Sequence, residues 1–312
     1  MPITVNIDNF PRAETDAMIA GLLPYTGGLG TFHHNRELEP FDRQPVIRQN
    51  RDTLYSVAVV DVAEGATLTV PDAADRYLSV MVINQDHYIN RVFHEAGTYE
   101  LTTAEFDTDY VVVAVRILFE PGNAADLAEV HRLQDGLSIR AGAQRPVTNP
   151  DYDLTSHRDV RDALLTLGRT MGGLTSCFGR RGDVDPVRHL VGTAVGWGGL
   201  PDDEAAYINV EPRLPLGRYT LTLDDVPASA FWSVSVYNAE GYFEPDESGV
   251  ANVNSVFAVR EPSGRTVIHL GDWGDDVPNR IALPKDWNYM IRLYQPRLDS
   301  LRTWAPPAVV PA

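Results

Sequence analysis

Chemically versatile side chains are concentrated in one short stretch, NQDHYINRVFHEAG, which spans residues 84–97. His87 and His94 stand there beside Asp86 and Arg91. Imidazole changes charge near neutral pH and can serve as a general base, while a neighbouring carboxylate can fix its tautomer. The same residues also fit the polar edge of a β-sheet, where they would bond only within their own loops. The stretch therefore indicates either an active site or a sheet edge.

Half of the eight histidines lie in the amino-terminal third of the chain, namely His33, His34, His87 and His94. Together with Asp52, Asp86 or Glu95 they could bind a divalent metal. The two-histidine spacing of cupin metal sites is absent, however, and a regular strand would turn His87 and His94 to opposite faces. The alternative is that each histidine bonds within its loop, so the cofactor stays unknown at this point.

A second polar segment, QNRDTLYS at residues 49–56, precedes an expected strand. Asn50, Asp52 and Thr53 can bond their own backbone in a turn. The functional alternative gives Arg51 the task of holding a substrate carboxylate through its two-pronged guanidinium, with Asp52 and Tyr55 as acid or base groups. Both interpretations stay open.

The two ends of the chain resemble each other. When residues 76–90 are placed over residues 230–244, five of the fifteen positions are identical without a gap. Each copy follows a TLT triplet and precedes an arginine-containing strand that ends in proline, VRILFEP or IRLYQP. We therefore predict an internal duplication.

The differences between the two copies are as informative as the matches. Asn84 and Tyr88 are present in both copies and are expected to belong to the scaffold. Gln85, Asp86 and His87 are replaced by Ala, Glu and Gly in the second copy. Polar groups needed by only one copy are better candidates for a site.

These observations favour a small-molecule enzyme of hydrolase or lyase type, with its site in the amino-terminal β domain. In this hypothesis His87 is the general base or a ligand, and Asp86 or Asp52 sets its tautomer. The candidate catalytic residues are His87, Asp52, Asp86, Tyr55 and His94. The candidate substrate-binding residues are Arg51, Asn50, Arg91, His33 and His34. The hypothesis requires the segments around residues 33, 51 and 87 to meet in one cavity, and a His87→Ala variant to lose turnover without losing stability.

The alternative hypothesis is a non-catalytic structural or binding protein that self-assembles. Either protein is expected to be a homo-oligomer.

Composition limits the partners. The 312 residues carry a formal net charge of -17, which would repel nucleic acid and anionic membrane surfaces. The longest apolar run, residues 110–119, is too short for a bilayer and contains Arg116. Cys177 is the only cysteine, so no intramolecular disulfide forms, and no Gly-x-Ser-x-Gly motif is present. The amino terminus shows no secretion signal, so we expect a cytoplasmic protein with a small-molecule ligand.

The elements that must position these residues are mainly strands. A helix is expected in NFPRAETDAMIAGLL, and two more in the middle of the chain, one capped by Asn123 and one ending near Gly172. The expected strands are DTLYSVAVVDV, ATLTV, RYLSVMVIN, GTYEL and YVVVAVRILFEP, then RYTLTL, FWSVSVYN, SVFAV, TVIHL and NYMIRLYQP. We expect an N-terminal β domain over residues 1–122, a helical connector over 123–210 and a C-terminal β domain over 211–312.

Several segments resemble a known bacterial family pair. NFPRAETD, HHNRE, VIRQNRDTLYSVAVVD and NQDHYINRVFHEAG are similar to the family called domain of unknown function 1254. FWSVSVYNAEGYF, NVNS, IHLG and WNYMIRLYQPR resemble its usual companion, domain of unknown function 1214. The resemblance implies two jelly-roll-like β-sandwich or barrel domains, similar to double jelly-roll capsid proteins, and it implies no reaction.

Overall fold

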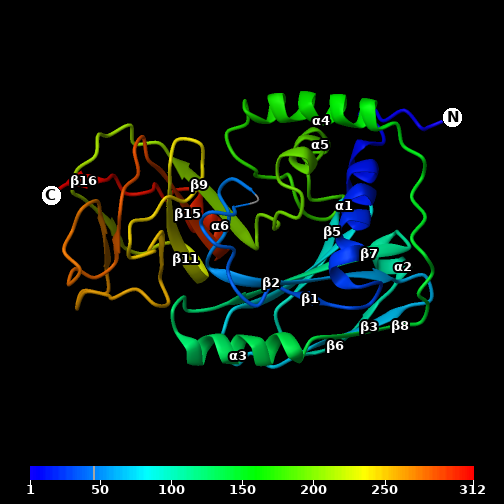
Figure 1. Ribbon diagram of the computed structural model, residues 1–312, viewed down its shortest axis with the longest axis horizontal. Helices are drawn as coiled ribbons and strands as arrows, with labels where there is room; N and C mark the ends of the chain where they lie inside the picture. Colours follow the sequence, from blue (N-terminus) through cyan, green and yellow to red (C-terminus); the bar gives the residue numbers. More distant parts are fainter. Residues whose placement is uncertain (45) are drawn as a thin grey trace. The chain divides into compact units, whose positions relative to one another are not determined.

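The fold is mainly β, as the sequence predicts. The computed structural model describes residues 1–44 and 46–312. Within these residues 29% are in strands and 20% in helices, the sheets are largely antiparallel, and no barrel is closed. The chain divides into two compact units (Figure 1). Unit 1 comprises residues 1–36 and 53–202, and unit 2 comprises residues 37–52 and 203–312.

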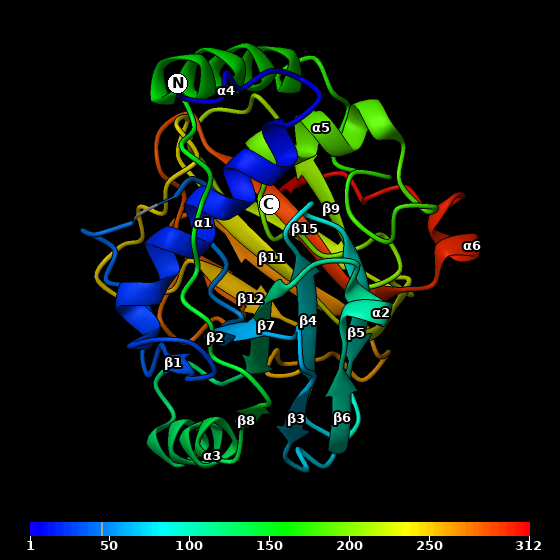
Figure 2. The same ribbon diagram turned by 90° about the vertical axis from the view of Figure 1, so that its right-hand side faces the viewer.

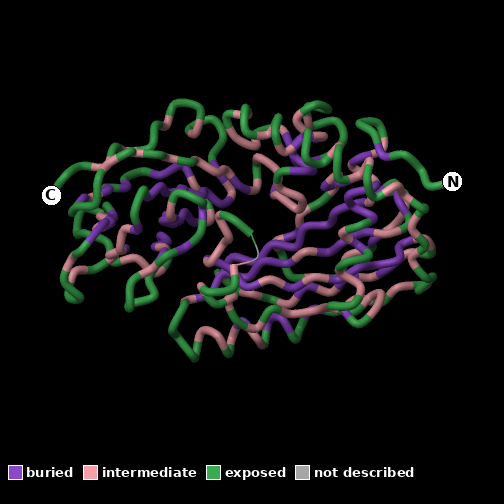
Figure 3. Tube along the Cα trace, turned by 45° about the horizontal axis from the view of Figure 1, so that its top comes forward, coloured by how far each residue is buried: buried purple, intermediate pink, exposed green. Residues whose placement is uncertain are grey.

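Unit 1 contains two antiparallel sheets. The larger has the strand order β1-β2-β7-β4-β5. Its strands are β1 (His33–His34), β2 (Thr53–Asp61), β4 (Leu78–Asn84), β5 (Ile89–Phe93) and β7 (Tyr110–Leu118). The smaller sheet has the order β6-β3-β8, from β3 (Ala66–Val70), β6 (Gly97–Leu101) and β8 (Ser138–Ala141). The burial of β4 is complete at every position, and β7 is rich in valine, so both suit the centre of a covered sheet (Figure 3).

The helices of unit 1 include three that pack on one another, α1 (Phe10–Thr26), α4 (Leu154–Gly168) and α5 (Pro186–Val195) (Figure 2). The other two are α2 (Thr103–Phe106) and α3 (Ala124–Asp135). Pro11 lies in the first turn of α1, and the Asn123 side chain caps α3, both as expected. α5 is a helix that the sequence patterns described do not predict. It begins at the Asp185 cap with Pro186 in its first turn.

The second helix expected in the middle of the chain is shorter than predicted, and its apolar residues are only partly buried. α4 ends at Gly168 rather than near Gly172, and of its apolar residues Leu164 is buried while Leu167 is 54% exposed. The residues expected as a connector contribute to unit 1, because β8 pairs with β3 and residues 123–202 belong to that unit. No helix in the described residues is long and apolar enough to cross a bilayer.

Unit 2 also contains two sheets. One has the order β12-β11-β15-β9, from β9 (Ala205–Val210), β11 (Ala228–Tyr237), β12 (Asn252–Asn254) and β15 (Asn288–Pro296). The other has the order β14-β13-β10-β16, from β10 (Tyr219–Leu223), β13 (Thr266–Leu270), β14 (Arg280–Ile281) and β16 (Val310–Pro311). Among the described residues of unit 2, the only helix is the short α6 (Leu298–Leu301). Apolar side chains of both sheets, including Val234, Ile268 and Ile291, form the core.

One strand prediction for unit 2 is wrong. SVFAV, residues 255–259, forms turns, and the strand lies just before it at Asn252–Asn254. The Asn254 side chain accepts hydrogen bonds from the backbone N–H groups of Val256 and Phe257, both at 3.1 Å. Such an asparagine turn competes with ladder hydrogen bonds and ends the strand.

Candidate functional site

The β4–β5 turn positions the candidate site of unit 1. The fully buried Asn84 accepts hydrogen bonds through Oδ1 from the N–H groups of Asp86 (3.0 Å) and Tyr88 (2.9 Å). Its Nδ2 donates to the carbonyl oxygen of Phe106 at 2.9 Å. This turn holds His87 at φ 63°, a left-handed conformation that is uncommon for residues other than glycine. The side chains of the turn residues are thereby fixed to a rigid backbone.

His87 is completely buried and both of its ring nitrogens are engaged. Nδ1 lies 2.8 Å from Thr193 Oγ1, and the Gly198 N–H donates to Nε2 at 2.9 Å. Since Nε2 accepts, the neutral ring carries its proton on Nδ1. The rings of Trp197 and Phe178 enclose it at centroid distances of 5.5 and 5.8 Å. Burial lowers the pKa of His87 well below its usual value, and the adjacent His189 adds to the effect.

His189, on α5, lies beside His87 with a different set of partners. Its Nδ1 lies 3.1 Å from the Cys177 carbonyl oxygen, and its Nε2 lies 3.1 Å from the Asp86 carbonyl oxygen. The ring stacks on Tyr88 at a centroid distance of 4.4 Å. Burial lowers the pKa of His189, whereas its two carbonyl partners act in the opposite direction.

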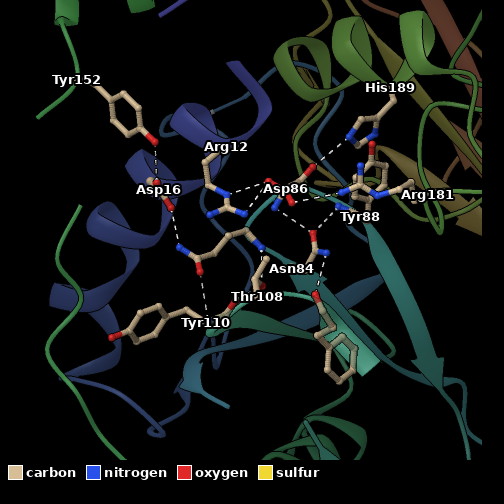
Figure 4. Close-up of polar contacts among 12 residues, drawn as sticks. Arg12, Asp16, Asn84, Asp86, Tyr88, Thr108, Tyr110, Tyr152, Arg181 and His189 are labelled. Atoms are coloured by element: carbon tan, nitrogen blue, oxygen red, sulfur yellow. Dashed lines mark hydrogen bonds and ion pairs between the residues drawn. The ribbon is translucent and has the colours of Figure 1, made fainter. Parts of the chain in front are cut away.

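The Asp86 carboxylate faces two arginines near the surface (Figure 4). Nε and Nη2 of Arg12 each lie 2.8 Å from its Oδ1. Nη2 of Arg181 lies 3.5 Å from its Oδ2, and the Arg181 guanidinium sits over the Tyr88 ring at 4.5 Å. The side chains are 27% exposed for Asp86, 38% for Arg12 and 65% for Arg181. We call Arg12, Asp86, Tyr88, Arg181 and His189 the Asp86 cluster.

A second carboxylate lies next to the cluster in a buried setting. Asp16 accepts hydrogen bonds from Gln85 Nε2 (2.9 Å) and Tyr152 Oη (3.1 Å), and only 2% of the residue is exposed (Figure 4). Burial raises the pKa of Asp16 and raises that of Tyr152 to about 12. Asp16 therefore fixes the turn residue Gln85 against α1.

Consecutive polar residues of α1 all face inward and engage different elements. Glu14 accepts from His157 at 2.7 Å and from Arg161 at 3.0 Å. Thr15 accepts from the Trp197 indole at 3.1 Å. Residues 12–16 (RAETD), which lie within the NFPRAETD segment quoted above, therefore line one side of the site.

The chemistry available to the Asp86 cluster is anion recognition. Two guanidinium groups share the Asp86 carboxylate at a partly exposed surface, and the neighbouring Asp16 carboxyl, which interacts with Arg12, is buried. The described residues offer no comparable site for a metal ion. Among residues 1–44 and 46–312, no three His, Cys, Asp or Glu side chains are grouped so that they could hold one. The histidine metal site considered from the sequence therefore has no counterpart in the described chain.

The four amino-terminal histidines do not converge. His34 pairs in register with Ser56 on the edge strand β1, and three strand spacings separate β1 from β4, or roughly 14 Å. His94 follows β5 whereas His87 precedes it, so the two lie at opposite ends of that strand. His34 bonds to Ser56 Oγ at 2.8 Å, and His94 bonds to the Leu78 carbonyl oxygen at 2.9 Å.

Three other candidates of unit 1 make contacts away from the Asp86 cluster. His33 contacts the Tyr25 ring, with a centroid distance of 6.1 Å. Tyr55 lies on β2 with its ring 5.2 Å from the Arg116 guanidinium carbon. Arg91 forms an ion pair with Glu105 at 3.0 Å.

The candidates at residues 50–52 belong to unit 2. Asn50 Oδ1 accepts from the Asp52 N–H at 2.7 Å, which is the turn expected as the structural alternative. Arg51 donates to the Glu39 carbonyl oxygen at 2.8 Å and stacks over the Phe41 ring at 3.9 Å. Burial lowers the pKa of Arg51 to about 10. Arg51 is thus committed to its own segment.

Asp52 is the centre of a buried polar network in unit 2. Its carboxylate accepts from Ser233 Oγ (2.6 Å), Asn252 Nδ2 (2.8 Å) and Tyr294 Oη (3.3 Å). Burial raises the pKa of Asp52, while the Arg292 charge and the three donors oppose that shift. This network anchors residues 37–52 to unit 2.

Arg292 holds the same segment from β15. It donates to the carbonyl oxygens of Arg48 (2.7 Å) and Gln49 (3.3 Å) and to Tyr237 Oη (2.8 Å). Burial alone would lower the pKa of Arg292, but the oxygens of Tyr237, Tyr294 and Asp52 raise it above its ordinary value. Residues 37–52 are therefore held by buried, charged and hydrogen-bonded contacts.

Sequence reasoning missed several residues of the Asp86 cluster and its support, which are Arg12, Asp16, Gln85, Tyr152, Arg181, His189, Thr193 and Trp197. Two signals existed. The Asp-Pro pair before α5, followed by apolar residues at helical spacing, predicts that helix and hence the shared face of His189 and Thr193. The alignment of residues 76–90 with residues 230–244 also distinguishes Gln85, which is Ala239 in the second segment.

Comparisons with known families agree with the resemblance stated from the sequence. Residues 29–98 match the family described as Protein of unknown function (DUF1254). Residues 212–298 match the family described as Protein of unknown function (DUF1214). No curated protein matches the chain.

Solved structures share the fold. The VPA0106 protein from Vibrio parahaemolyticus is 18% identical with a TM-score of 0.72, over 98% of this chain and 99% of that chain. An uncharacterized protein from Burkholderia cenocepacia is 14% identical with a TM-score of 0.53, over 96% of this chain and 86% of that chain. At these identities the likeness concerns the fold alone.

Replacing Asp52 should destabilise unit 2 strongly. Asp52→Leu leaves Arg292 without its nearby negative charge and three donors without an acceptor, so we expect the free energy of unfolding to fall by about 3–5 kcal/mol. Asp52→Asn keeps the shape and part of the hydrogen bonding and should cost less. Urea denaturation followed by circular dichroism measures both, with the exposed Asp42→Asn as control. A loss below about 1 kcal/mol for Asp52→Leu would contradict this role.

The buried state of His87 predicts a loss of stability rather than a selective loss of function. His87→Ala removes two hydrogen bonds and leaves a cavity, so we expect about 3 kcal/mol of destabilisation. His87→Gly should lose about 1 kcal/mol less, because glycine tolerates the left-handed conformation. Thermal and urea unfolding of both variants test the order. Wild-type stability in His87→Ala would refute the structural role.

Unfolding should become easier as the pH falls below the ordinary histidine value. The folded-state pKa is lowered for His34, to about 4, and also for His87 and His189, largely through burial. At these three histidines the unfolded chain binds more protons below about pH 6.5, so they make the free energy of unfolding decline toward pH 4, against an opposite contribution from the raised pKa values of Asp16 and Asp52. Urea midpoints between pH 7.5 and 4.5 measure this slope. His34→Asn should lessen it, and an unchanged slope would show that His34 contributes nothing.

Proposed function

This chain belongs to the proteins that join a DUF1254 segment to a DUF1214 segment, and we propose that its unit 1 binds small organic anions at the Asp86 cluster. The observation that carries the proposal is the convergence of Arg12 and Arg181 on the half-buried Asp86 carboxylate. Neither family name supplies a reaction, so the proposal rests on the site alone.

Arg181 is the group that would receive the ligand. Its 3.5 Å separation from Asp86 exceeds the usual length of a charge-assisted hydrogen bond, so most of its donors are not used by that carboxylate. The Arg181 side chain is 65% exposed, and its planar guanidinium lies over the Tyr88 ring, which limits its motion. A carboxylate can bind to such a guanidinium through two parallel hydrogen bonds.

Arg12 supplies the second positive charge and holds the Asp86 carboxylate in place. Both of its contacts fall on Oδ1 of Asp86, which leaves Oδ2 facing Arg181. The incoming anion would therefore meet the Arg12 guanidinium, which Asp86 holds closely, and the Arg181 guanidinium, which Asp86 holds only loosely. The buried layer behind them is hydrogen-bonded, which keeps the site preorganised.

The site favours binding over the hydrolase or lyase chemistry that was centred on His87. The ring nitrogens of His87 already bond to Thr193 and to the Gly198 N–H, and the side chain is fully buried. A general base must reach the proton that it removes. We therefore assign His87 to the scaffold of the site.

We also propose that the two units are copies of one jelly-roll-like domain. The order β2-β7-β4-β5 in unit 1 corresponds, strand for strand along the chain, to β9-β15-β11-β12 in unit 2, and β6-β3-β8 corresponds to β13-β10-β16. The turns correspond too. Asn238 Oδ1 accepts from the Tyr242 N–H at 2.9 Å, and Gly241 takes the left-handed position of His87 with φ 90°.

Binding of simple anions tests the proposed function. We expect benzoate to bind the full-length protein by isothermal titration calorimetry, with acetate and sulfate as smaller probes. Arg181→Ala should weaken the affinity by about 10- to 100-fold, which corresponds to one charged hydrogen-bonding group. The matched control is Arg91→Ala, which removes another partly exposed, ion-paired arginine of unit 1.

Two results would contradict the proposal. One is the absence of binding by all three anions. The other is equal affinity in wild type and Arg181→Ala, which would place the anion elsewhere.

A further inference from the structure

We propose that His189 is the proton-binding site of the Asp86 cluster, and that an anion bound there is taken up together with a proton on this imidazole. The inference rests on the proposed function for its anion and deepens it by naming a second, linked ligand. It assigns His189 as a positioning residue, because its ring contacts the backbone of Asp86 rather than the anion.

The geometry around His189 requires two N–H donors. Each of its ring nitrogens lies 3.1 Å from a carbonyl oxygen, that of Cys177 on one side and that of Asp86 on the other. Carbonyl oxygens only accept, and a neutral imidazole has one N–H. A neutral ring would therefore direct a lone pair at one of the two oxygens. The imidazolium form satisfies both.

The neighbouring His87 shows the opposite arrangement. One of its nitrogens accepts a hydrogen bond from the Gly198 backbone, so adding a proton there would break that bond. Two imidazoles with a centroid distance of 5.6 Å thus have different roles fixed by backbone partners. A proton entering this layer goes to His189.

The charged and titratable groups that act on His189 lie on the β4–β5 turn and on the loop before α5. The β4–β5 turn contributes the Asp86 carboxylate, which raises the pKa of His189, and the neutral His87. Tyr88 stacks on one face of the ring. The loop before α5 contributes Arg181, which lowers the pKa, and the buried Cys177, whose carbonyl raises it.

The anion site and the proton site are linked through Arg181 and Tyr88. Arg181 lies over the Tyr88 ring at 4.5 Å, and His189 stacks on that ring at 4.4 Å. In the free protein the Arg181 charge and burial both disfavour imidazolium. An anion on Arg181 offsets that charge and so favours the proton. By linkage, the proton must favour the anion equally.

Direct observation of the imidazole nitrogens tests the assignment without any anion. We expect long-range ¹H–¹⁵N spectra of the full-length protein to show His189 gaining a second N–H on acidification below pH 6.5, while His87 keeps one. His189→Gln identifies the signals. A His189 ring that keeps one N–H at every pH at which the protein stays folded would overturn the inference.

Calorimetry tests the linkage. Benzoate titrations in buffers of different ionisation enthalpy should show uptake of up to one proton, and affinity should rise up to about tenfold per unit fall in pH above the free-state midpoint. His189→Gln should remove this pH dependence. His269→Gln, which changes a partly exposed histidine of unit 2 bonded to the Pro278 carbonyl, should preserve it.

The outcomes separate the two proposals. Benzoate binding that is independent of pH, or proton uptake that survives in His189→Gln, overturns the linkage and leaves the anion site standing. A failure of all anions to bind removes the anion site and the linkage together. In that case the nitrogen spectra still confirm or refute the proton site.

Discussion

The site depends on one constraint, the need to satisfy the polar groups of a turn that is buried between helices. Asn84 does this by closing the β4–β5 turn with its own side chain and by donating to the Phe106 carbonyl oxygen. Once the turn is closed, Gln85, Asp86 and His87 point in fixed directions toward α1 and α5. A buried donor or acceptor left without a partner would cost about 1–3 kcal/mol. On α1, Arg12 and Asp16 supply partners for the side chains of Asp86 and Gln85 in this turn.

Local patterns in the sequence predict the strands and the first helix well. Alternation and β-branched content locate β2, β4, β7, β11 and β15, and the proline and asparagine signals locate α1 and the start of α3. The comparison of the two copies also separates the shared Asn84 from Gln85, Asp86 and His87, which are the residues that face α1 and α5. These predictions succeed because they depend on neighbouring residues and on a similarity between residues 76–90 and 230–244 that the sequence itself displays.

Contacts between distant residues could not be predicted in this way. Residues 37–52 lie between two strands of unit 1 in the sequence, yet Asp52 bonds to Ser233 and Asn252 of unit 2. The expectation that Arg51 and His87 share a cavity assumed that neighbours in sequence stay in one unit. Likewise, the pairing of Arg12 with Asp86 joins residues 74 positions apart, and no local pattern indicates it.

The β4–β5 turn of unit 1 and the turn at residues 238–242 of unit 2 differ at one informative position. Gly241 occupies the left-handed position in unit 2, where glycine has little steric cost. His87 occupies the same position in unit 1 despite that cost, and its ring is buried between Thr193, Trp197 and Gly198. A residue kept in an unfavourable conformation must be compensated by the contacts of its side chain. In unit 1 those contacts hold α5 against the turn, and α5 is the element that brings His189 to the Asp86 carbonyl oxygen. The difference at this single position therefore explains why the polar layer is built on the β4–β5 turn, whereas the corresponding turn of unit 2 has no side chain at that position to hold a helix.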